Sequence, residues 1–417
     1  MEFEPWWLLA LPIFFALGWF AARADLRQLA RESKRLPDAY FRGLNFLLNE
    51  ESDRAIDAFV DVVRLDPDAA ELHFALGNLF RRRGETDRAI RVHQHLAGRS
   101  DLAPKVRQQA HFELGQDYLK AGLLDRAEAA FDELSGGALA TRALLCRLEI
   151  AQTERDWARA IGLAEEFLAL APARLEPTEL AARDRVLAAS VHFYCEQACD
   201  ALNLSPQADC AGAERALASA ARQPQGTAHP RVWELRAELA QRRGDSTLAL
   251  QAWQSLASGQ PDYLAPFAER ALQHWEAAGQ LKQGLEWLER CRAAVPASDL
   301  LCALAQARAR LNGAGEAAHW LTGALQQTPS LLGLECLLGL RAQARHGNPD
   351  GAETVDPAAL PVLDDALVRG FFGPQVQRLA RYRCGQCGFE GRRFHWHCPG
   401  CNRWDSFAPR RIEEIPV

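Results

Sequence analysis

The sequence carries three copies of one short pattern: FRGLNFL at residues 41–47, FALGNLF at residues 74–80 and FELGQDYL at residues 112–119. The glycine of the second copy follows the first glycine after 34 residues, and the third glycine follows after 38 more. An alanine stands 12 residues after each glycine. The positions are Gly43, Gly77 and Gly115, with Ala55, Ala89 and Ala127. A period of this length predicts helix pairs in series rather than one compact core.

Other positions of the repeat agree with the signature of a tetratricopeptide (TPR) helix pair. Phe59 and Phe131 each stand four residues after an alanine, and Pro67 closes the first repeat 24 residues after Gly43. Small residues let two helices approach closely. One pair cannot bury its own apolar face, so successive pairs stack into a superhelical solenoid with a concave surface.

Later repeats follow the same pattern with interruptions. A fourth repeat ends near Pro172, and residues 172–230 depart from the consensus, with a break at APARLEPTE and a loop near Ser205-Pro206. The pattern returns in repeats six to eight and ends in a capping helix over Leu331–Arg345. The positions that carry it are Trp157, Ala160, Phe167, Trp233, Ala249, Trp253, Gly284, Leu288, Ala317 and Leu321. We expect an all-α TPR array over residues 39–345, in which the role of residues 172–230 is open.

Composition supports stacked helices and excludes some function classes. The chain has 417 residues, 48% of them hydrophobic, and a net charge of -6, so it is not a nucleic-acid binder by overall charge. Seven of its 11 cysteines are scattered through helical patterns, which indicates a reducing compartment rather than a disulfide framework. They are Cys146, Cys195, Cys199, Cys210, Cys291, Cys302 and Cys336.

The N-terminus predicts a membrane anchor over residues 1–22. Pro5 to Ala22 contains no charged residue and is about long enough to span a bilayer. Tryptophans flank it, Glu2 and Glu4 precede it, and a basic juxtamembrane helix over residues 23–38 follows. The positive-inside rule then places the N-terminus outside and the remainder of the chain in the cytoplasm, as a single-pass membrane protein. A cleaved signal peptide requires a basic n-region, which is absent; a soluble N-terminal helix is the other alternative.

The helical region contains no catalytic signature. We find no Walker loop, no GxSxG and no HExxH, so the sequence predicts a protein that is not an enzyme. His111, His192 and His274 are single histidines on helices, expected to be packing residues. Cys195 and Cys199 share a helix face with His192 one turn earlier; we interpret this as packing, with a metal site as the weaker alternative.

The C-terminus carries the strongest chemical signal. Residues 382–404 read YRCGQCGFEGRRFHWHCPGCNRW, with two CxxC pairs separated by ten residues. Four thiolates suit one zinc or one iron ion in a tetrahedral site. The predicted ligands are Cys384, Cys387, Cys398 and Cys401. Each CxxC turn needs a residue that tolerates positive φ directly after its second cysteine, and Gly388 and Asn402 stand there.

This tail is expected to fold as a ribbon over residues 380–411, after a linker and short helix over residues 346–379. Because so small a domain cannot bury enough apolar surface to be stable, the metal is expected to be structural. His395 and His397 adjoin the third cysteine but are not needed as ligands. An electron carrier with iron in the site is the rival interpretation. The excess of arginine leaves an RNA-binding regulator as a third, although a lipid or protein contact fits it equally well.

The order of these parts resembles one bacterial family, that of lipopolysaccharide assembly protein B (LapB, also called YciM). The resemblance covers the full length. It is strongest in the first repeats and in YRCGQCGF…WHCPGC, which resembles the rubredoxin-like ribbon of that family, and is weakest over residues 172–230. It implies an anchored TPR solenoid with a four-Cys ribbon.

The resemblance also implies a function that residue spacing cannot show. Family members act on the cytoplasmic side of the inner membrane as adaptors. They promote proteolysis of the lipid A enzyme LpxC by the membrane protease FtsH, under restraint by a membrane regulator of the YejM/PbgA type, and they help to organise lipopolysaccharide assembly proteins. The partner-binding surface would be the concave TPR face, and no nucleic-acid partner is expected.

Overall fold

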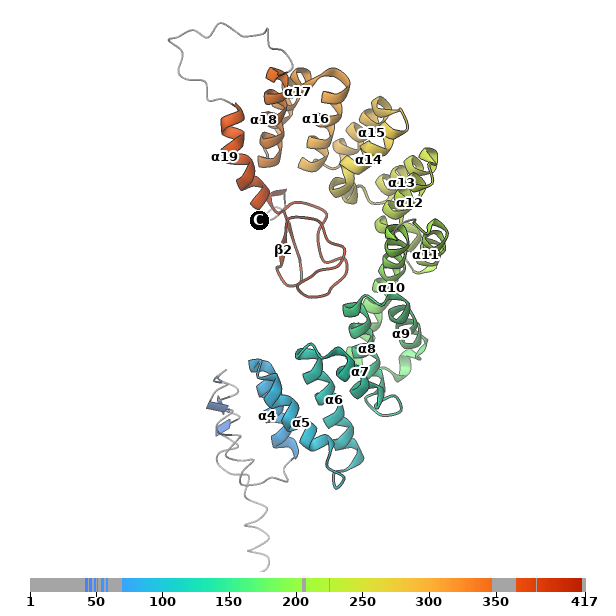
Figure 1. Ribbon diagram of the computed structural model, residues 1–417, viewed down its shortest axis with the longest axis vertical. Coiled ribbons are helices and arrows are strands. Elements are labelled where there is room, and N and C mark those ends of the chain that lie inside the picture. Colours follow the sequence, from blue (N-terminus) through green and yellow to red (C-terminus); the bar gives the residue numbers. More distant parts are fainter. Residues whose placement is uncertain are drawn as a thin grey trace, which may run out of the picture. The chain divides into compact units, whose positions relative to one another are not determined.

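The computed structural model is helical, with a small C-terminal ribbon, and divides into two compact units, Met1–Asp156 (unit 1) and Trp157–Val417 (unit 2) (Figure 1). The described residues are 70–204, 208–224, 226–346, 365–379 and 381–414, together with isolated positions between 42 and 58. The predicted anchor (residues 1–22), the juxtamembrane helix (23–38) and most of the first repeat and the linker lie outside them. No helix of the described residues is long and apolar enough to cross a membrane.

Unit 1 contains antiparallel helix pairs that follow the predicted repeats. Its helices are α4 (Ala70–Arg83), α5 (Thr86–Ala97), α6 (Pro104–Lys120), α7 (Leu124–Asp132) and α8 (Ala140–Glu154). α4 packs against α5 and α6, and α6 packs against α7. The short connections contain glycines at positive φ, Gly84 at 85° and Gly122 at 75°, a conformation that side chains with a Cβ rarely adopt.

The repeat glycines and alanines lie where the helices of a pair meet, as predicted. A Cβ on Gly77 would be 2.4 Å from the His93 ring of the next helix, and one on Gly115 would be 2.6 Å from the Phe131 ring. Ala89 is fully buried. The large side chain of one helix therefore fills the space that the missing Cβ of the other leaves.

Unit 2 continues the helix pairs. Its helices are α9 (Trp157–Ala169), α10 (Pro177–Asn203), α11 (Cys210–Arg222), α12 (Pro230–Arg242), α13 (Ser246–Gly259), α14 (Ala268–Ala277), α15 (Leu281–Ala294), α16 (Ser298–Asn312), α17 (Ala314–Gln327), α18 (Leu331–His346) and α19 (Asp365–Arg378). Short 3-10 turns connect them: η1 (Pro172–Arg174), η2 (Gly226–Ala228), η3 (Pro261–Phe267) and η4 (Ile412–Glu414).

The region that departs from the repeat consensus still forms a helix pair. α10 is 27 residues long and begins at Pro177 with a capping box between Glu176 and Glu179. α10 and α11 pack through a shared apolar cluster with α12. Its members include Val191, Cys195, Leu202, Ala213 and Leu217. The departure from the consensus therefore changes the length of the helices, but the two helices still pack as a pair through an apolar cluster.

α19 precedes the ribbon. It continues to Arg378 with Pro374 inside it and packs against α18. Val376, in its last turns, is buried. Burial against α18 offsets the hydrogen bond that a proline removes from a helix interior.

The C-terminal ribbon is a small β-structure beside unit 2 helices (Figure 1). β1 (Tyr382–Arg383) pairs antiparallel with β2 (Glu390–Gly391). Isolated bridges join Cys384 to Phe407 and His397 to Trp404. A core of four buried residues holds it together: Tyr382, Cys384, Cys398 and Phe407.

Candidate metal centre and ribbon interface

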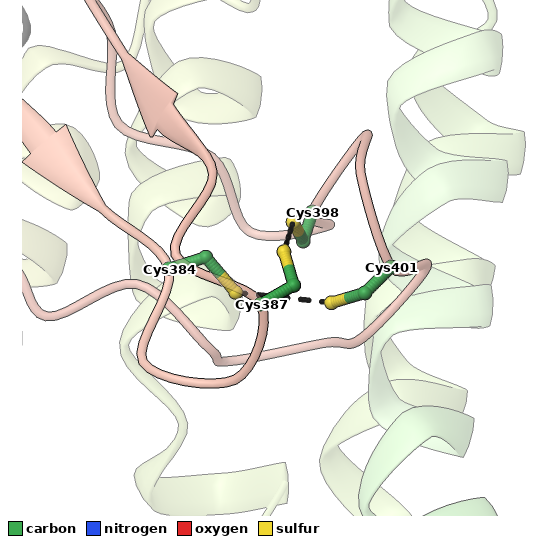
Figure 2. Close-up of side chains that lie close together, drawn as sticks. All are labelled: Cys384, Cys387, Cys398 and Cys401. Carbon is green, nitrogen blue, oxygen red and sulfur yellow. Dashed lines mark hydrogen bonds between the residues drawn. The ribbon is translucent and has the colours of Figure 1, made fainter. Parts of the chain in front are cut away.

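The four predicted cysteines converge on one point between the two loops that carry them (Figure 2). The sulfurs lie within 4.8 Å of one another, with Cys384 3.8 Å from Cys401 and Cys387 3.7 Å from Cys398. Zn–S bonds of about 2.3 Å in a tetrahedron place neighbouring sulfurs about 3.8 Å apart. The cluster therefore fits one tetrahedral metal ion, which a four-thiolate site can supply as zinc or iron.

Both loops have the backbone geometry that the sequence predicts. Gly388 has φ 74° and Asn402 has φ 53°. Backbone N–H groups of Gln386 and Gly400 point to the sulfurs of Cys384 and Cys398, each at 3.4 Å. Such donors stabilise thiolate charge and hold the ligands in position.

The two histidines beside the third cysteine pack against aromatic rings. The His397 ring stacks on Trp404 with centroids 4.2 Å apart, and the His395 ring lies 5.5 Å from that of Phe407. Neither belongs to the group of ligand atoms.

Two tryptophans of the ribbon insert among aromatic and basic residues of unit 2. The Trp404 ring stacks on His192 of α10 at 4.6 Å and meets the edge of Trp157 at 6.1 Å. The Trp396 ring stacks on Tyr263 of η3 at 5.3 Å. These ring contacts join the ribbon to α9, α10 and η3, and polar contacts join it to α12 and α16. Together they form the ribbon interface.

Asp405 provides the central polar contact of this interface. Its carboxylate accepts a hydrogen bond from His192 Nε2 at 2.8 Å and lies 3.4 Å from His229 Nε2. Its backbone has φ 50°, a left-handed conformation that aspartate adopts more readily than most residues. Burial raises the pKa of Asp405, but the hydrogen bonds from the two histidines outweigh it and hold the pKa well below its usual range.

Arg231 of α12 determines which ring nitrogen of His192 carries the proton. Its guanidinium lies 3.1 Å from His192 Nδ1 and also pairs with Glu196 at 2.6 Å. Because arginine can only donate, Nδ1 is the acceptor and Nε2 carries the proton given to Asp405. Burial lowers the pKa of His192 to about 4, and the hydrogen bond to Asp405 only partly opposes this.

This tautomer argues against a second metal site. His192, His229 and Asp405 place ligand atoms within 4.8 Å of one another, as a metal site would. A metal on His192 Nε2 would require the proton on Nδ1, where Arg231 already donates. The three residues are better explained as a hydrogen-bonded network that joins the ribbon to α10 and α12.

Two further polar contacts fasten the ribbon. The indole N–H of Trp396 donates to Glu234 of α12 at 3.1 Å, and Glu234 also pairs with Arg270 at 2.7 Å. Arg411 makes a bidentate contact with Asp299 of α16 at 2.7 and 2.8 Å. The contacts are spread along several helices, so the ribbon is fixed in orientation as well as in position.

Other residues singled out from sequence have local roles. His274 accepts a hydrogen bond from the Trp253 indole at 3.0 Å, and His111 lies 2.9 Å from Glu133. Cys195 and Cys199 do not join His192 in a group of metal-ligand atoms among the described residues. Cys195 is instead buried, and burial raises its pKa to about 12.

The contribution of Asp405 was missed by sequence reasoning, as were His229, Arg231 and Glu234. One signal was available in the helices. His192 and Glu196 stand four residues apart on α10, on a buried face. Charged residues are almost never fully buried without a partner, so a partner from elsewhere in the chain was to be expected.

Two family models match parts of this chain. A family model described as a rubredoxin metal binding domain matches residues 382–409, and a tetratricopeptide repeat model matches residues 72–105. Among solved structures, yeast Tom70 aligns with a TM-score of 0.34 at 9% identity, covering 82% of this chain and 84% of its own. A tetratricopeptide repeat protein from Parabacteroides merdae aligns with a TM-score of 0.26 at 13% identity, covering 73% and 98%.

Curated relatives match over nearly their whole length. Lipopolysaccharide assembly protein B of Escherichia coli strain K12 is 31% identical over 405 residues, which is 97% of both chains. The protein of the same name from Haemophilus influenzae is 28% identical over 421 residues, covering 97% of this chain and 98% of its own. The chain therefore belongs to the lipopolysaccharide assembly protein B family.

Proposed function

We propose that this chain is a non-catalytic adaptor of lipopolysaccharide assembly, held at the cytoplasmic face of the inner membrane by its N-terminal segment. In this role it presents LpxC to the protease FtsH and so limits lipid A synthesis, under restraint by a membrane regulator of the YejM/PbgA type. The observation that carries the proposal is the relationship to assembly proteins over 97% of both chains.

The architecture supports an adaptor on physical grounds. Stacked helix pairs offer an extended surface on which a protein client can bind without chemistry. A tether beside a membrane protease raises the effective concentration of that client by confining it near the enzyme. The metal ribbon then serves to complete the surface of unit 2, since it is held there by the contacts of Asp405, Trp396 and Arg411.

The test is the half-life of LpxC in Gram-negative cells that lack their own family member. The full chain should restore rapid turnover. A variant without residues 1–22 should fold and accumulate but leave LpxC stable, because the tether is lost. Normal turnover with that truncation would contradict the anchored adaptor. A full chain that does not shorten the half-life of LpxC would contradict the proteolysis step.

A further inference from the structure

A pocket of about 400 Å³ lies between the ribbon and the helices of unit 2. Its array side comes from η3, α14, α16 and α18, and its ribbon side from the β1–β2 region and Arg411. This volume is within the range of small-ligand sites. Five arginines line it: Arg270, Arg381, Arg392, Arg393 and Arg411.

Two of these arginines are neutralised by acidic partners. Arg411 holds Asp299 in its bidentate contact, and Arg270 pairs with Glu234. The two pairs belong to the ribbon interface, and they stabilise the walls of the pocket rather than offer free charge to a ligand.

The other three arginines have no carboxylate partner among the described residues. Arg381, Arg392 and Arg393 appear in no side-chain ion pair there, whereas Arg383, their neighbour on β1, pairs with Glu390 at 2.6 Å. The Nε of Arg381 is buried without a hydrogen-bond acceptor. Arg392 and Arg393 are exposed at the pocket, so their guanidinium groups can turn their donors to an acceptor from outside the chain.

The charge of the pocket selects the class of ligand. Glu269 is the remaining acidic residue in its lining, so three unpaired cations face one exposed carboxylate, an excess of two positive charges. A phosphate monoester carries about −1.5 to −2 charges near neutral pH and has three strong acceptor oxygens. The planar forks of arginine match those oxygens in pairs.

We propose that this pocket, the arginine pocket, binds a phosphate monoester. Phe267, Tyr382 and Phe394 also line it and provide apolar surface for the body of a ligand beyond its phosphate. A soluble metabolite and a phosphorylated lipid headgroup share this chemistry. The proposal goes beyond the adaptor role and does not rest on it. Ligand binding to the purified chain can be measured directly, whether or not the chain acts as an adaptor.

The arginine pocket exists only when the ribbon is in place. Its three unpaired arginines all belong to the ribbon, while the opposite wall belongs to unit 2 helices. Ligand binding therefore stabilises the ribbon interface, and loss of the interface removes the ligand site.

The experiment is calorimetric titration of the purified full-length chain with glycerol 3-phosphate and, separately, with the soluble lipid dihexanoyl phosphatidic acid. We expect saturable binding of one equivalent. The double variant Arg392→Gln, Arg393→Gln should weaken binding at least about tenfold, because each removes charge-assisted hydrogen bonds. Equal affinity for the two probes assigns the site to soluble phosphomonoesters, and tighter binding of the lipid assigns it to headgroups.

The matched control is Arg383→Gln, which removes one positive charge from the same ribbon outside the pocket lining. It should bind both probes as the unmodified chain does. Metal content and thermal midpoint of all variants report whether the ribbon is intact. The proposal is overturned if neither probe binds saturably, if Arg383→Gln weakens binding as much as the double variant, or if an acidic peptide binds and neither phosphate probe does.

Discussion

Asp405 shows how one side chain can connect segments far apart in the sequence. Its carboxylate lies 2.8 Å from His192 Nε2, across 213 positions of the chain. The left-handed backbone at φ 50° turns the ribbon so that this carboxylate meets both His192 and His229. Aspartate adopts the left-handed conformation at a lower energetic cost than most residues, and here that conformation places its carboxylate between the two imidazole rings.

Replacing Asp405 with alanine should loosen the ribbon. The buried N–H of His192 would lose its acceptor, at a cost of roughly 1–3 kcal/mol. We expect faster proteolytic cleavage within the ribbon and a lower free energy of unfolding of unit 2. The matched control is Asp262→Ala, which breaks the exposed pair with Arg410 and should cost only about 0–1 kcal/mol. Equal effects of the two substitutions would show that Asp405 has no special role.

The stability of unit 2 should depend on pH through His192. Its pKa is lowered from 6.5 to about 4, so the fold favours the neutral ring facing Asp405, His229 and Arg231. The unfolded chain binds the proton more tightly. Stability is therefore complete above pH 6.5 and falls as the pH drops toward 4.

Urea unfolding at about pH 7.5 and about pH 5 should differ by about 2 kcal/mol because of this residue. In His192→Asn the absolute stability should be lower, but this part of the pH dependence should vanish. The control is His111→Asn, in unit 1, which should keep the dependence. An unchanged pH dependence in His192→Asn would be inconsistent with titration of this ring.

In the helix pairs, close packing favours glycine where two helices meet, whereas helix propensity disfavours glycine everywhere in a helix. Gly284 of α15 lies against Trp275, where a Cβ would be 2.5 Å from the ring. Gly323 of α17 is exposed, and a Cβ there would meet nothing within 4 Å. The two positions lie on the second helices of successive pairs, so they are a matched comparison.

Gly284→Ala should destabilise unit 2 by about 1–3 kcal/mol, because the tryptophan must shift. Gly323→Ala should instead stabilise it by about 0.5–1 kcal/mol through helix propensity. Chemical denaturation of the two variants measures both effects. A stabilising Gly284→Ala would mean that the Trp275 ring can move without loss of packing.

The core of the ribbon is only a few residues, so we expect the ribbon to depend on a bound metal ion for its stability. Structural zinc sites contribute about 10–16 kcal/mol to the folding of such domains. We expect the double variant Cys384→Ser, Cys387→Ser to lose its metal and its resistance to protease in the ribbon, while helical circular dichroism is retained. Cys210→Ser, on α11, is the control and should keep one equivalent of metal. Full metal content in the double variant would disprove the ligand assignment.

Within unit 2, the ribbon and the helices stabilise each other. Asp405 contacts α10, Trp396 contacts α12 through Glu234, and Arg411 contacts α16. Each contact places a charged or polar group of a helix in a buried setting that only the ribbon completes. Loss of the ribbon would expose this whole face.

Hydrogen exchange after removal of the metal by a chelator should show this coupling. Protection of backbone amides should fall in α10, α12 and α16, since they lose the ribbon, and should stay unchanged in α4–α7 of unit 1. Readdition of zinc should restore it. Uniform loss of protection across both units would indicate global unfolding, and no change in α10 and α12 would show that the ribbon contacts contribute nothing to unit 2.

The helix pairs and the metal site can be predicted from the sequence, because the interactions that form them are between residues close together in the chain. The spacing of Gly77 and Ala89 predicts a helix pair, and two CxxC turns followed by Gly388 and Asn402 predict the metal site, because ligands and backbone conformations there are set within a few residues. In α19, packing on α18 offsets the local effect of Pro374, which lies inside the helix and removes one backbone hydrogen bond.

The ribbon interface and the arginine pocket were not readable in this way. His192 resembles an ordinary packing residue until folding brings Asp405 and Arg231 to its two ring nitrogens. The arginines of the tail form one basic run in the sequence, yet folding neutralises Arg411 and Arg383 and leaves Arg381, Arg392 and Arg393 around a common space. Local order encodes helices and metal ligands, whereas partners hundreds of residues apart are chosen by burial and charge once the helices have packed.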